Sequence, residues 1–238
     1  MTNRVLLNNV DHADLRVITR HGPEFGDAIN QALVLPTELE AAQREYPIFL
    51  RRDANGEYQA VVLLGLDRNE NLFLDGDGWQ ARYVPAVQQR GPFSIALQEG
   101  RDGTEPMLHI DLDHPRVSRT EGEPLFLSAG GNAPYLQHVA RMMGTVYDGL
   151  EISRAFFEAL ESAGLIEPIS VEVKLNDREE YVLPDLYTIS QDRLKELPPE
   201  DLARLNQAGV LRAAYMVVSS LGNMSRLIDA KNRKLAAL

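Results

Sequence analysis

The 238-residue sequence predicts an α+β protein. We expect a β-rich N-terminal half with short helices, then a long central helix, a β-hairpin and C-terminal helices. Three observations predict this class. Short apolar runs separated by turn residues fill the first half. A helical apolar pattern runs from Ala133 to about Ala163, and a strictly alternating segment, Ile169–Leu175, follows it. We expect a single domain over residues 1–238, with lobes at 1–128 (β-rich) and 129–238 (helix-rich).

The N-terminal half predicts short strands joined by tight turns. Asn55-Gly56 is a strong hairpin signal that joins Pro47–Arg52 to Glu57–Leu66. The second strand is apolar on both faces from Ala60 to Leu64, so we expect it at the centre of a sheet. Other strands are expected at Val5–Leu7, Leu15–Thr19, Asn71–Leu74, Ala81–Val84, Phe93–Leu97 and Met107–Leu112, with a turn at Arg101–Gly103.

Helix signals come from capping residues and glycines. Thr37 and Glu40 have the spacing of a capping box at the start of a helix over Pro36–Tyr46. Asn132 is expected to cap the long helix and Gly164 to end it, while Gly144 and Gly149 weaken it or permit close packing. After the alternating strand come a turn at Asn176-Asp177, strands at Glu180–Leu183 and Leu186–Ile189, and helices at Asp192–Leu197, at Pro199–Ala208 and from Val210 onward.

Composition excludes several classes of protein. The absence of cysteine excludes disulfides, thiolate metal sites and a cysteine nucleophile. The net charge of −11 argues against a general nucleic-acid binder. No apolar run reaches the roughly 18–20 residues of a membrane helix, and the first apolar stretch is too short for a signal peptide. We therefore expect a soluble, cytoplasmic protein without nucleic-acid or membrane contact, although export by a signal-free route would leave the same composition.

Charge is distributed unevenly along the chain. Residues 191–238 carry a net charge of +3, and residues 1–190 carry −14. A basic C-terminal segment on an acidic body predicts one of three arrangements: docking within its own protein, docking against an acidic partner, or a solvated helix face.

The metal candidate is His109-Ile-Asp111. Alternate strand positions face one way, so His109 and Asp111 match part of a two-histidine, one-carboxylate iron site, with His138 or His21 as the distant third ligand. The alternative is a half-buried strand with one polar face. We favour the alternative and expect no metal and no cofactor.

Other chemical motifs are incomplete. Asp67, Asn69 and Asn71 occupy the first, third and fifth places of a calcium loop, but Leu72 and Gly78 replace its essential glycine and glutamate. Tight turns explain these residues better. No nucleotide-binding glycine loop or nucleophile elbow is present, so catalytic residues stay unassigned.

The segment from Trp79 to Phe93 is the candidate ligand site. It holds the sole tryptophan, and Pro85 and Pro92 bracket a short helix within it. Trp79, Tyr83, Arg90 and Phe93 could converge around a planar ligand or a peptide. The alternative is that the aromatic rings pack in the hydrophobic core, while Arg90 donates hydrogen bonds to backbone carbonyls or pairs with an acidic neighbour.

Segments along nearly the whole chain match the pattern of one known family, in order. They are Tyr46-Pro-Ile-Phe49, Ala60-Val-Val-Leu-Leu-Gly-Leu66, Glu70-Asn-Leu-Phe73, Gly78-Trp-Gln-Ala-Arg-Tyr-Val-Pro85, Gly91-Pro-Phe93, Ile110-Asp111, Glu121-Gly-Glu-Pro-Leu-Phe126, Leu165-Ile-Glu-Pro168, Leu205-Asn-Gln-Ala-Gly-Val-Leu211 and Ser219-Ser-Leu221. In these segments the chain resembles the bacterial SapC family.

The resemblance implies an accessory role and leaves open whether the protein is an enzyme. Members of that family often accompany halogenase-like and hydroxylase-like proteins, which implies such a companion as partner. The family pattern keeps Asp111 but not His109. We expect a non-catalytic accessory protein that binds a peptide or protein. The alternatives are a non-haem iron oxygenase-like enzyme that uses His109 and Asp111, and a surface-layer component, which the family name implies.

Overall fold

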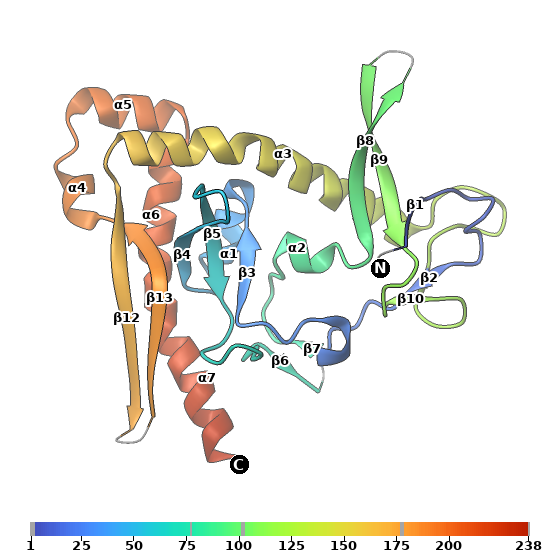
Figure 1. The fold of residues 1–238 in the computed structure, drawn as a ribbon, viewed down its shortest axis with the longest axis horizontal. Helices are drawn as coiled ribbons and strands as arrows, with labels where there is room; N and C mark the ends of the chain where they lie inside the picture. Colours follow the sequence, from blue (N-terminus) through green and yellow to red (C-terminus); the bar gives the residue numbers. More distant parts are fainter. Residues whose placement is uncertain (1–2, 77, 101–102, 177–178, 238) are drawn as a thin grey trace. The chain divides into compact units, whose positions relative to one another are not determined.

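The computed structural model describes residues 3–76, 78–100, 103–176 and 179–237, and it confirms the α+β class (Figure 1). The turns expected at Arg101–Gly103 and Asn176-Asp177 fall partly outside these residues. None of the described helices combines the length and apolarity that a membrane-spanning helix needs.

Two compact units make up the chain, and they interleave in sequence. Unit 1 comprises Met1–Asp27 and Ala86–Asp148, and unit 2 comprises Ala28–Pro85 and Gly149–Leu238. These boundaries differ from the lobes expected at residues 1–128 and 129–238. The physical reason is strand pairing: the strands within residues 31–63 form one sheet with the strands within residues 166–189, so both segments belong to unit 2.

Unit 1 is built on an antiparallel sheet in the order β1-β9-β8. Its strands are β1 (Arg4–Leu6), β8 (Phe93–Gly100) and β9 (Gly103–Asp111), and a smaller sheet holds β2 (Arg16–Val17), β10 (Val117–Ser118) and β11 (Glu123–Pro124). The short helices η1 (Pro23–Phe25) and α2 (Ala86–Gln89) and the first part of α3 (Pro134–Ser162) complete it. Its buried apolar core consists of Leu15, Val17, Phe93, Ile110, Leu125, Leu136, Val139 and Met143.

Unit 2 contains a five-stranded antiparallel sheet in the order β12-β13-β4-β5-β3. The strands are β3 (Gln31–Val34), β4 (Ile48–Arg52), β5 (Tyr58–Leu63), β12 (Ile166–Asn176) and β13 (Glu179–Ile189), with a separate pair β6 (Leu74–Asp75) and β7 (Gly78–Trp79). Strand β5 lies between β4 and β3, as its two apolar faces predict, and its residues Ala60–Leu63 are buried. The hairpin turn at Asn55-Gly56 is also confirmed, with Gly56 at a φ of 82°.

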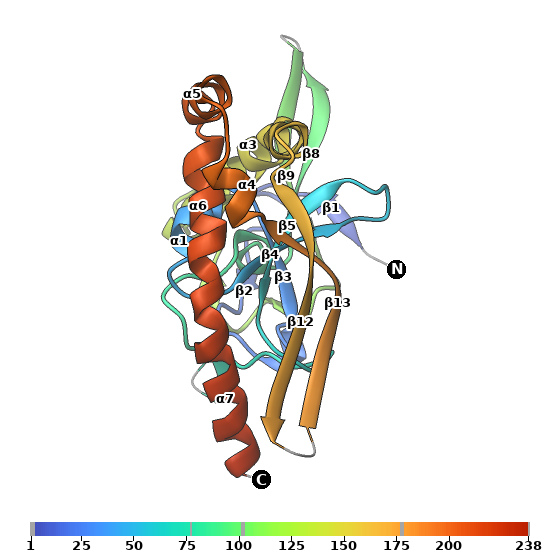
Figure 2. The same ribbon diagram turned by 90° about the vertical axis from the view of Figure 1, so that its left-hand side faces the viewer.

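The helices of unit 2 pack on this sheet and on one another. They are η2 (Pro36–Glu38), α1 (Leu39–Ala42), α4 (Gln191–Lys195), α5 (Pro199–Gln207), α6 (Val210–Ser220), η3 (Leu221–Asn223) and α7 (Met224–Ala236). Helix α6 packs on β4 and β13, and α7 continues beside the β12–β13 hairpin (Figure 2). The long helix α3 ends as expected, because Gly164 adopts a φ of 64° and closes its last turn.

Several local predictions are wrong for identifiable reasons. The capping partner of η2 is Glu38 rather than Glu40, because Glu38 accepts the N–H of Leu35 at 2.9 Å, whereas Glu40 pairs with Arg44 and Arg212. The helix that follows ends at Ala42, well before Tyr46. The two strands expected at Glu180–Leu183 and Leu186–Ile189 form one strand, β13, because Asp185 takes a φ of 58° and the pairing continues past it.

Strand assignments failed where apolar content was the only guide. Ala81–Val84 is not a strand, and Asn71–Leu74 is mostly a turn that leads into β6. Strand β3 was not expected, because its four residues, Gln31–Val34, are too few to display a pattern. Its existence depends on pairing with β5.

The basic C-terminal segment docks within its own unit. Arg212 pairs with Glu40 at 2.7 Å and Arg226 with Glu45 at 2.9 Å. Further along, Lys231 and Lys234 both bond Glu70 at 2.8 Å. Attraction between this segment and the acidic body therefore operates inside unit 2, the first of the three arrangements expected.

Lys231 is a buried charge, only 3% exposed. Its Nζ donates to Asp67 and Glu70 and lies 5.3 Å from the centre of the Tyr181 ring. Glu70 also accepts the backbone N–H groups of Leu66 and Asp67. The residues that resembled a calcium loop therefore form a turn closed by a lysine.

Replacing Lys231 with alanine should destabilise unit 2 by about 3–5 kcal/mol, because Glu70 would keep a buried charge without its main partner. Urea unfolding followed by Trp79 fluorescence measures this, since the sole tryptophan lies in unit 2. Lys234→Ala is the matched control: it bonds the same carboxylate but is half exposed and should cost little. Equal losses for the two variants would contradict the assignment.

Stability of unit 2 should fall on acidification. Burial opposes ionisation of Glu70, but hydrogen bonds from Lys231, Lys234 and two backbone N–H groups outweigh it and hold the pKa below its usual value. The carboxylate therefore contributes its full stabilisation above the unfolded pKa of about 4.3 and loses it as pH falls through the lower folded pKa. Urea titrations at several pH values should show a shallower acid loss for Glu70→Gln than for the wild type.

Candidate functional site

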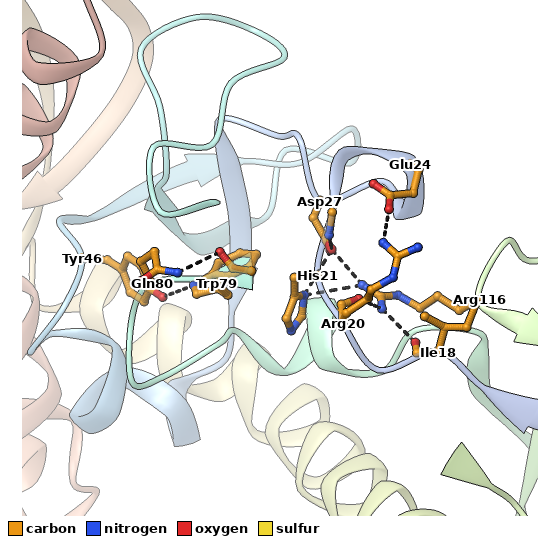
Figure 3. A network of polar contacts seen from close by, with 11 residues as sticks. Ile18, Arg20, His21, Glu24, Asp27, Tyr46, Trp79, Gln80 and Arg116 are labelled. Atoms are coloured by element: carbon orange, nitrogen blue, oxygen red, sulfur yellow. Dashed lines mark hydrogen bonds and ion pairs between the residues drawn. The ribbon is translucent and has the colours of Figure 1, made fainter. Parts of the chain in front are cut away.

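Trp79 and Tyr83 belong to a hydrogen-bonded network in unit 2. The indole Nε1 of Trp79 donates to the hydroxyl of Tyr46 at 2.7 Å (Figure 3). That hydroxyl donates to the backbone carbonyl of Tyr83, and the Tyr83 hydroxyl donates to Glu38. Burial raises the pKa of the Tyr46 and Tyr83 phenols, with the charge of Glu38 adding to the effect on Tyr83. Both phenols therefore stay protonated and act as donors.

Arg90 and Phe93 belong to unit 1. Arg90 is exposed at the end of α2, and its N–H bonds the carbonyl of Ala86. Phe93 is 1% exposed and lies in the core, with its ring centre 6.3 Å from that of Tyr135. The structure thus joins Trp79 to Tyr83 and places Arg90 and Phe93 in the other unit. A ligand surface shared by all four residues stays a prediction.

His109 and Asp111 lie two residues apart on β9, opposite Leu6 and Arg4 of β1. The Nδ1 of His109 lies 3.3 Å from the Met107 carbonyl, and Asp111 accepts the backbone N–H groups of Asn3 and Asp113. Within the described ranges, no three His, Asp or Glu side chains gather closely enough to hold a metal ion. The third ligand that an iron site needs is therefore not supplied by this part of the chain.

A buried polar cluster of unit 1 joins His21, Asp27 and Arg116. Asp27 accepts Nη2 of Arg116 at 2.7 Å, the N–H of Gly22 at 2.9 Å and Nδ1 of His21 at 3.1 Å (Figure 3). The other terminal nitrogen of Arg116 donates to the carbonyls of Ile18 and Arg20. Burial opposes ionisation of Asp27, but the bonds from His21 and Gly22 and the charge of Arg116 outweigh it and lower its pKa.

This cluster borders a hollow of about 130 Å³ that also contacts Thr19, Tyr135 and His138. A carboxylate beside a histidine is one requirement of acid–base chemistry. However, burial raises the pKa of Tyr135 to about 12, so its hydroxyl is no nucleophile at neutral pH. Arg116 also uses both of its terminal nitrogens to hold the loop of residues 18–27. The arrangement is best explained as a structural ion pair of Arg116 and Asp27 that holds the loop of residues 18–27 in place, and we call this pair the clasp.

Sequence reasoning missed Arg116, which is 4% exposed. An arginine buried to this degree is almost always paired, but its partners lie about 90–100 positions earlier in the chain, and no local pattern connects them. Its guanidinium carbon also lies 4.6 Å from the centre of the Phe25 ring.

A further candidate site is a groove in unit 2, which we call the hairpin groove. It has a volume of about 330 Å³ and lies between the β4–β5 hairpin, the end of β3 and the second half of α3. Its apolar lining consists of Leu33, Val34, Leu35, Ala60, Leu150 and Phe157. Most of these side chains are buried, but Leu150 is 54% exposed. An apolar side chain of a ligand would therefore find contacts there without displacing the core.

Charged side chains surround this apolar lining. Asp53 and Glu57 come from the hairpin, and Arg154, Glu158 and Glu161 from α3. Four carboxylates thus face one guanidinium of the lining, which bonds Glu158 at 2.9 Å, and Glu161 lies 3.9 Å from the guanidinium of Arg52, outside the lining. Glu57 has no ion pair with any residue that the structure describes. The groove therefore has a negative charge that its own side chains do not neutralise.

Gly149 allows α3 to approach this region closely. A Cβ atom built at Gly149 would lie 2.8 Å from both the Leu35 side chain and the Thr37 hydroxyl. This confirms the close packing that the helix glycine predicted. One edge of the groove is consequently held against α3 by direct contact.

A family model described as SapC matches residues 7–227 of the chain. The match spans both units. No curated protein and no solved structure matches the chain.

Arg116→Met should destabilise unit 1 by about 3–5 kcal/mol, because the buried Asp27 would lose its permanent cation. Arg119→Met is the matched control: its ion pair with Asp14 is exposed and should contribute little. Unfolding followed by far-UV circular dichroism, with amide hydrogen exchange of residues 18–27, measures both variants. An unchanged exchange rate in that loop would rule out the clasp.

Proposed function

The chain belongs to the SapC family, and we propose that it is a non-catalytic accessory protein whose hairpin groove binds a peptide segment carrying apolar and cationic side chains. The observation that carries this proposal is a partly exposed apolar lining beside four carboxylates, of which Glu57 forms no ion pair within the described residues. Other side chains that could take part in a reaction, such as Asp27 and Tyr46, are held in buried hydrogen-bond networks.

Charge supports a cationic ligand. Carboxylates at the edge of a groove attract lysine or arginine side chains and steer them toward the site. Glu57 and Glu158 come from opposite sides of the groove, the hairpin and α3. A basic side chain between them would contact both, and it would meet the carboxylates without the desolvation cost of a fully buried pair.

The apolar lining supports a peptide over a small cation. A lone ammonium ion would leave Leu150 exposed, whereas a Val or Leu side chain beside the basic residue would bury it. A volume of about 330 Å³ suits a few residues of chain rather than a folded domain.

We propose that the segment is supplied by a companion protein, and the halogenase-like or hydroxylase-like companion implied by the family resemblance is one source. We base no enzymatic proposal on His109 and Asp111, because the described residues supply no third ligand near them.

A fluorescein-labelled peptide, Gly-Lys-Val-Lys-Leu-Gly, should bind the full chain in anisotropy titrations. A version with Glu in place of both lysines, and one with Ser in place of Val and Leu, should bind at least about tenfold more weakly, since about 1.4 kcal/mol separates each tenfold step. Binding should weaken in high salt because the groove charges are exposed. Equal affinity for the three peptides would defeat the proposal.

Variants of the protein locate the site. Glu57→Gln with Glu158→Gln, and separately Leu150→Ser, should each weaken binding about tenfold, whereas Glu200→Gln, an exposed carboxylate on α5, should not. If the surface expected from the sequence binds instead, Arg90→Ala and Trp79→Phe will lower affinity and the groove variants will leave it unchanged.

A further inference from the structure

Strand β5 extends past the end of its neighbour β3. The last pair between them is Val34 with Ala60, whereas β5 begins two residues earlier, at Tyr58. On its other side, β5 remains paired with β4 up to Arg52 and Tyr58. Tyr58 therefore lies in a two-stranded part of the sheet, with one edge open toward the hairpin groove that it lines.

Hydrogen bonds alternate between the two sides of a strand in an antiparallel sheet, and this alternation shows which way the N–H and C=O of Tyr58 point. Along β5 and the residue before it, the positions that bond the β4 side are odd-numbered: Leu63 donates to Pro47, next to β4, and Glu57 accepts from Asp53. Even-numbered residues bond on the β3 side, as Leu64 does to Asn30 at 2.7 Å. The N–H and C=O of Tyr58 consequently point away from β4, toward the path of β3.

The residue that would face Tyr58 on this path is Pro36. Continuing the register of Val34 with Ala60 by two positions places Pro36 opposite Tyr58. Proline has no N–H to donate to the Tyr58 carbonyl. The chain instead turns at Pro36 into η2, so β3 offers Tyr58 no partner.

We propose that the peptide of the hairpin groove binds as an added strand in line with β3 and antiparallel to β5. One ligand residue accepts the N–H of Tyr58 and donates its own N–H to the Tyr58 carbonyl. This inference rests on the proposed function, and it adds the conformation and the backbone contact. Recognition at an open sheet edge uses main-chain hydrogen bonds for affinity and side-chain contacts for specificity.

The side-chain contacts agree with an extended ligand. Adjacent residues of a strand point to opposite faces, so the residue opposite Tyr58 and its neighbours place side chains on both faces of the sheet. Apolar contacts are available at Leu150 and Phe157, and carboxylates at Glu57 and Glu158. A short extended segment that mixes apolar and basic residues would meet both.

Backbone substitutions in the ligand test the added strand. Each residue of Gly-Lys-Val-Lys-Leu-Gly is N-methylated in turn, and affinity is measured by anisotropy. One position should lose affinity about three- to tenfold, the range of a single hydrogen bond, while its two neighbours change less than about twofold. A uniform effect along the peptide would overturn the strand geometry.

Two variants at one position test the protein side. Tyr58→Ala removes the ring, which packs against Arg52 and Tyr187, but keeps the N–H. Tyr58→Pro removes the ring and also the N–H that points into the groove, while the bonds to β4 do not use that N–H. The proline variant should bind the peptide about three- to tenfold more weakly than the alanine variant. Equal affinities would overturn the proposal.

Hydrogen exchange gives a readout without any substitution. The Tyr58 amide should exchange quickly in the free protein and slow at least about tenfold when the peptide is saturating, whereas the Gln59 amide, bonded to β4, should be protected in both states. Peptide binding that leaves the Tyr58 amide unprotected would contradict the added-strand geometry but not the proposed function. Failure of every peptide to bind would contradict both.

Discussion

Pro36 sets the geometry of the region that we assign to binding. Because it cannot complete the rung opposite Tyr58, β3 ends and the chain turns into η2. Glu38, in that turn, accepts the N–H of Leu35 and the hydroxyl of Tyr83. The same turn therefore leaves an edge of β5 open and is fixed in place by the network that continues to Tyr46 and Trp79.

Each unit contains a buried ion pair, and these two pairs explain why several reactive-looking residues are structural. Asp27 and Arg116 clasp a loop of unit 1, and Glu70 and Lys231 attach the C-terminal helix α7 within unit 2. Removing one member of such a pair leaves an uncompensated charge in a poorly solvated place. These residues are therefore constrained by folding, and their chemistry is not available to a ligand.

The carboxylates of the hairpin groove are in the opposite situation. They are largely exposed, they are held by few internal contacts, and Glu57 has no ion pair within the described ranges. Keeping an exposed charge costs the fold little, so such groups are available to recognise a partner. The acidic composition of the chain thus has two uses: binding its own basic C-terminal segment, and presenting a negative groove.

Local patterns in the sequence determined much of the architecture. Asn55-Gly56 predicted the hairpin, the apolar run Ala60–Leu64 predicted a central strand, and Gly164 predicted the end of α3, because each depends on residues adjacent in the chain. Tertiary pairing alone decided that β3 exists, that Pro36 falls opposite Tyr58, and that Arg116 and Lys231 are buried against carboxylates. The physical reason is that periodicity reports which face of an element is apolar, whereas register and ion pairing depend on which distant segment lies beside it.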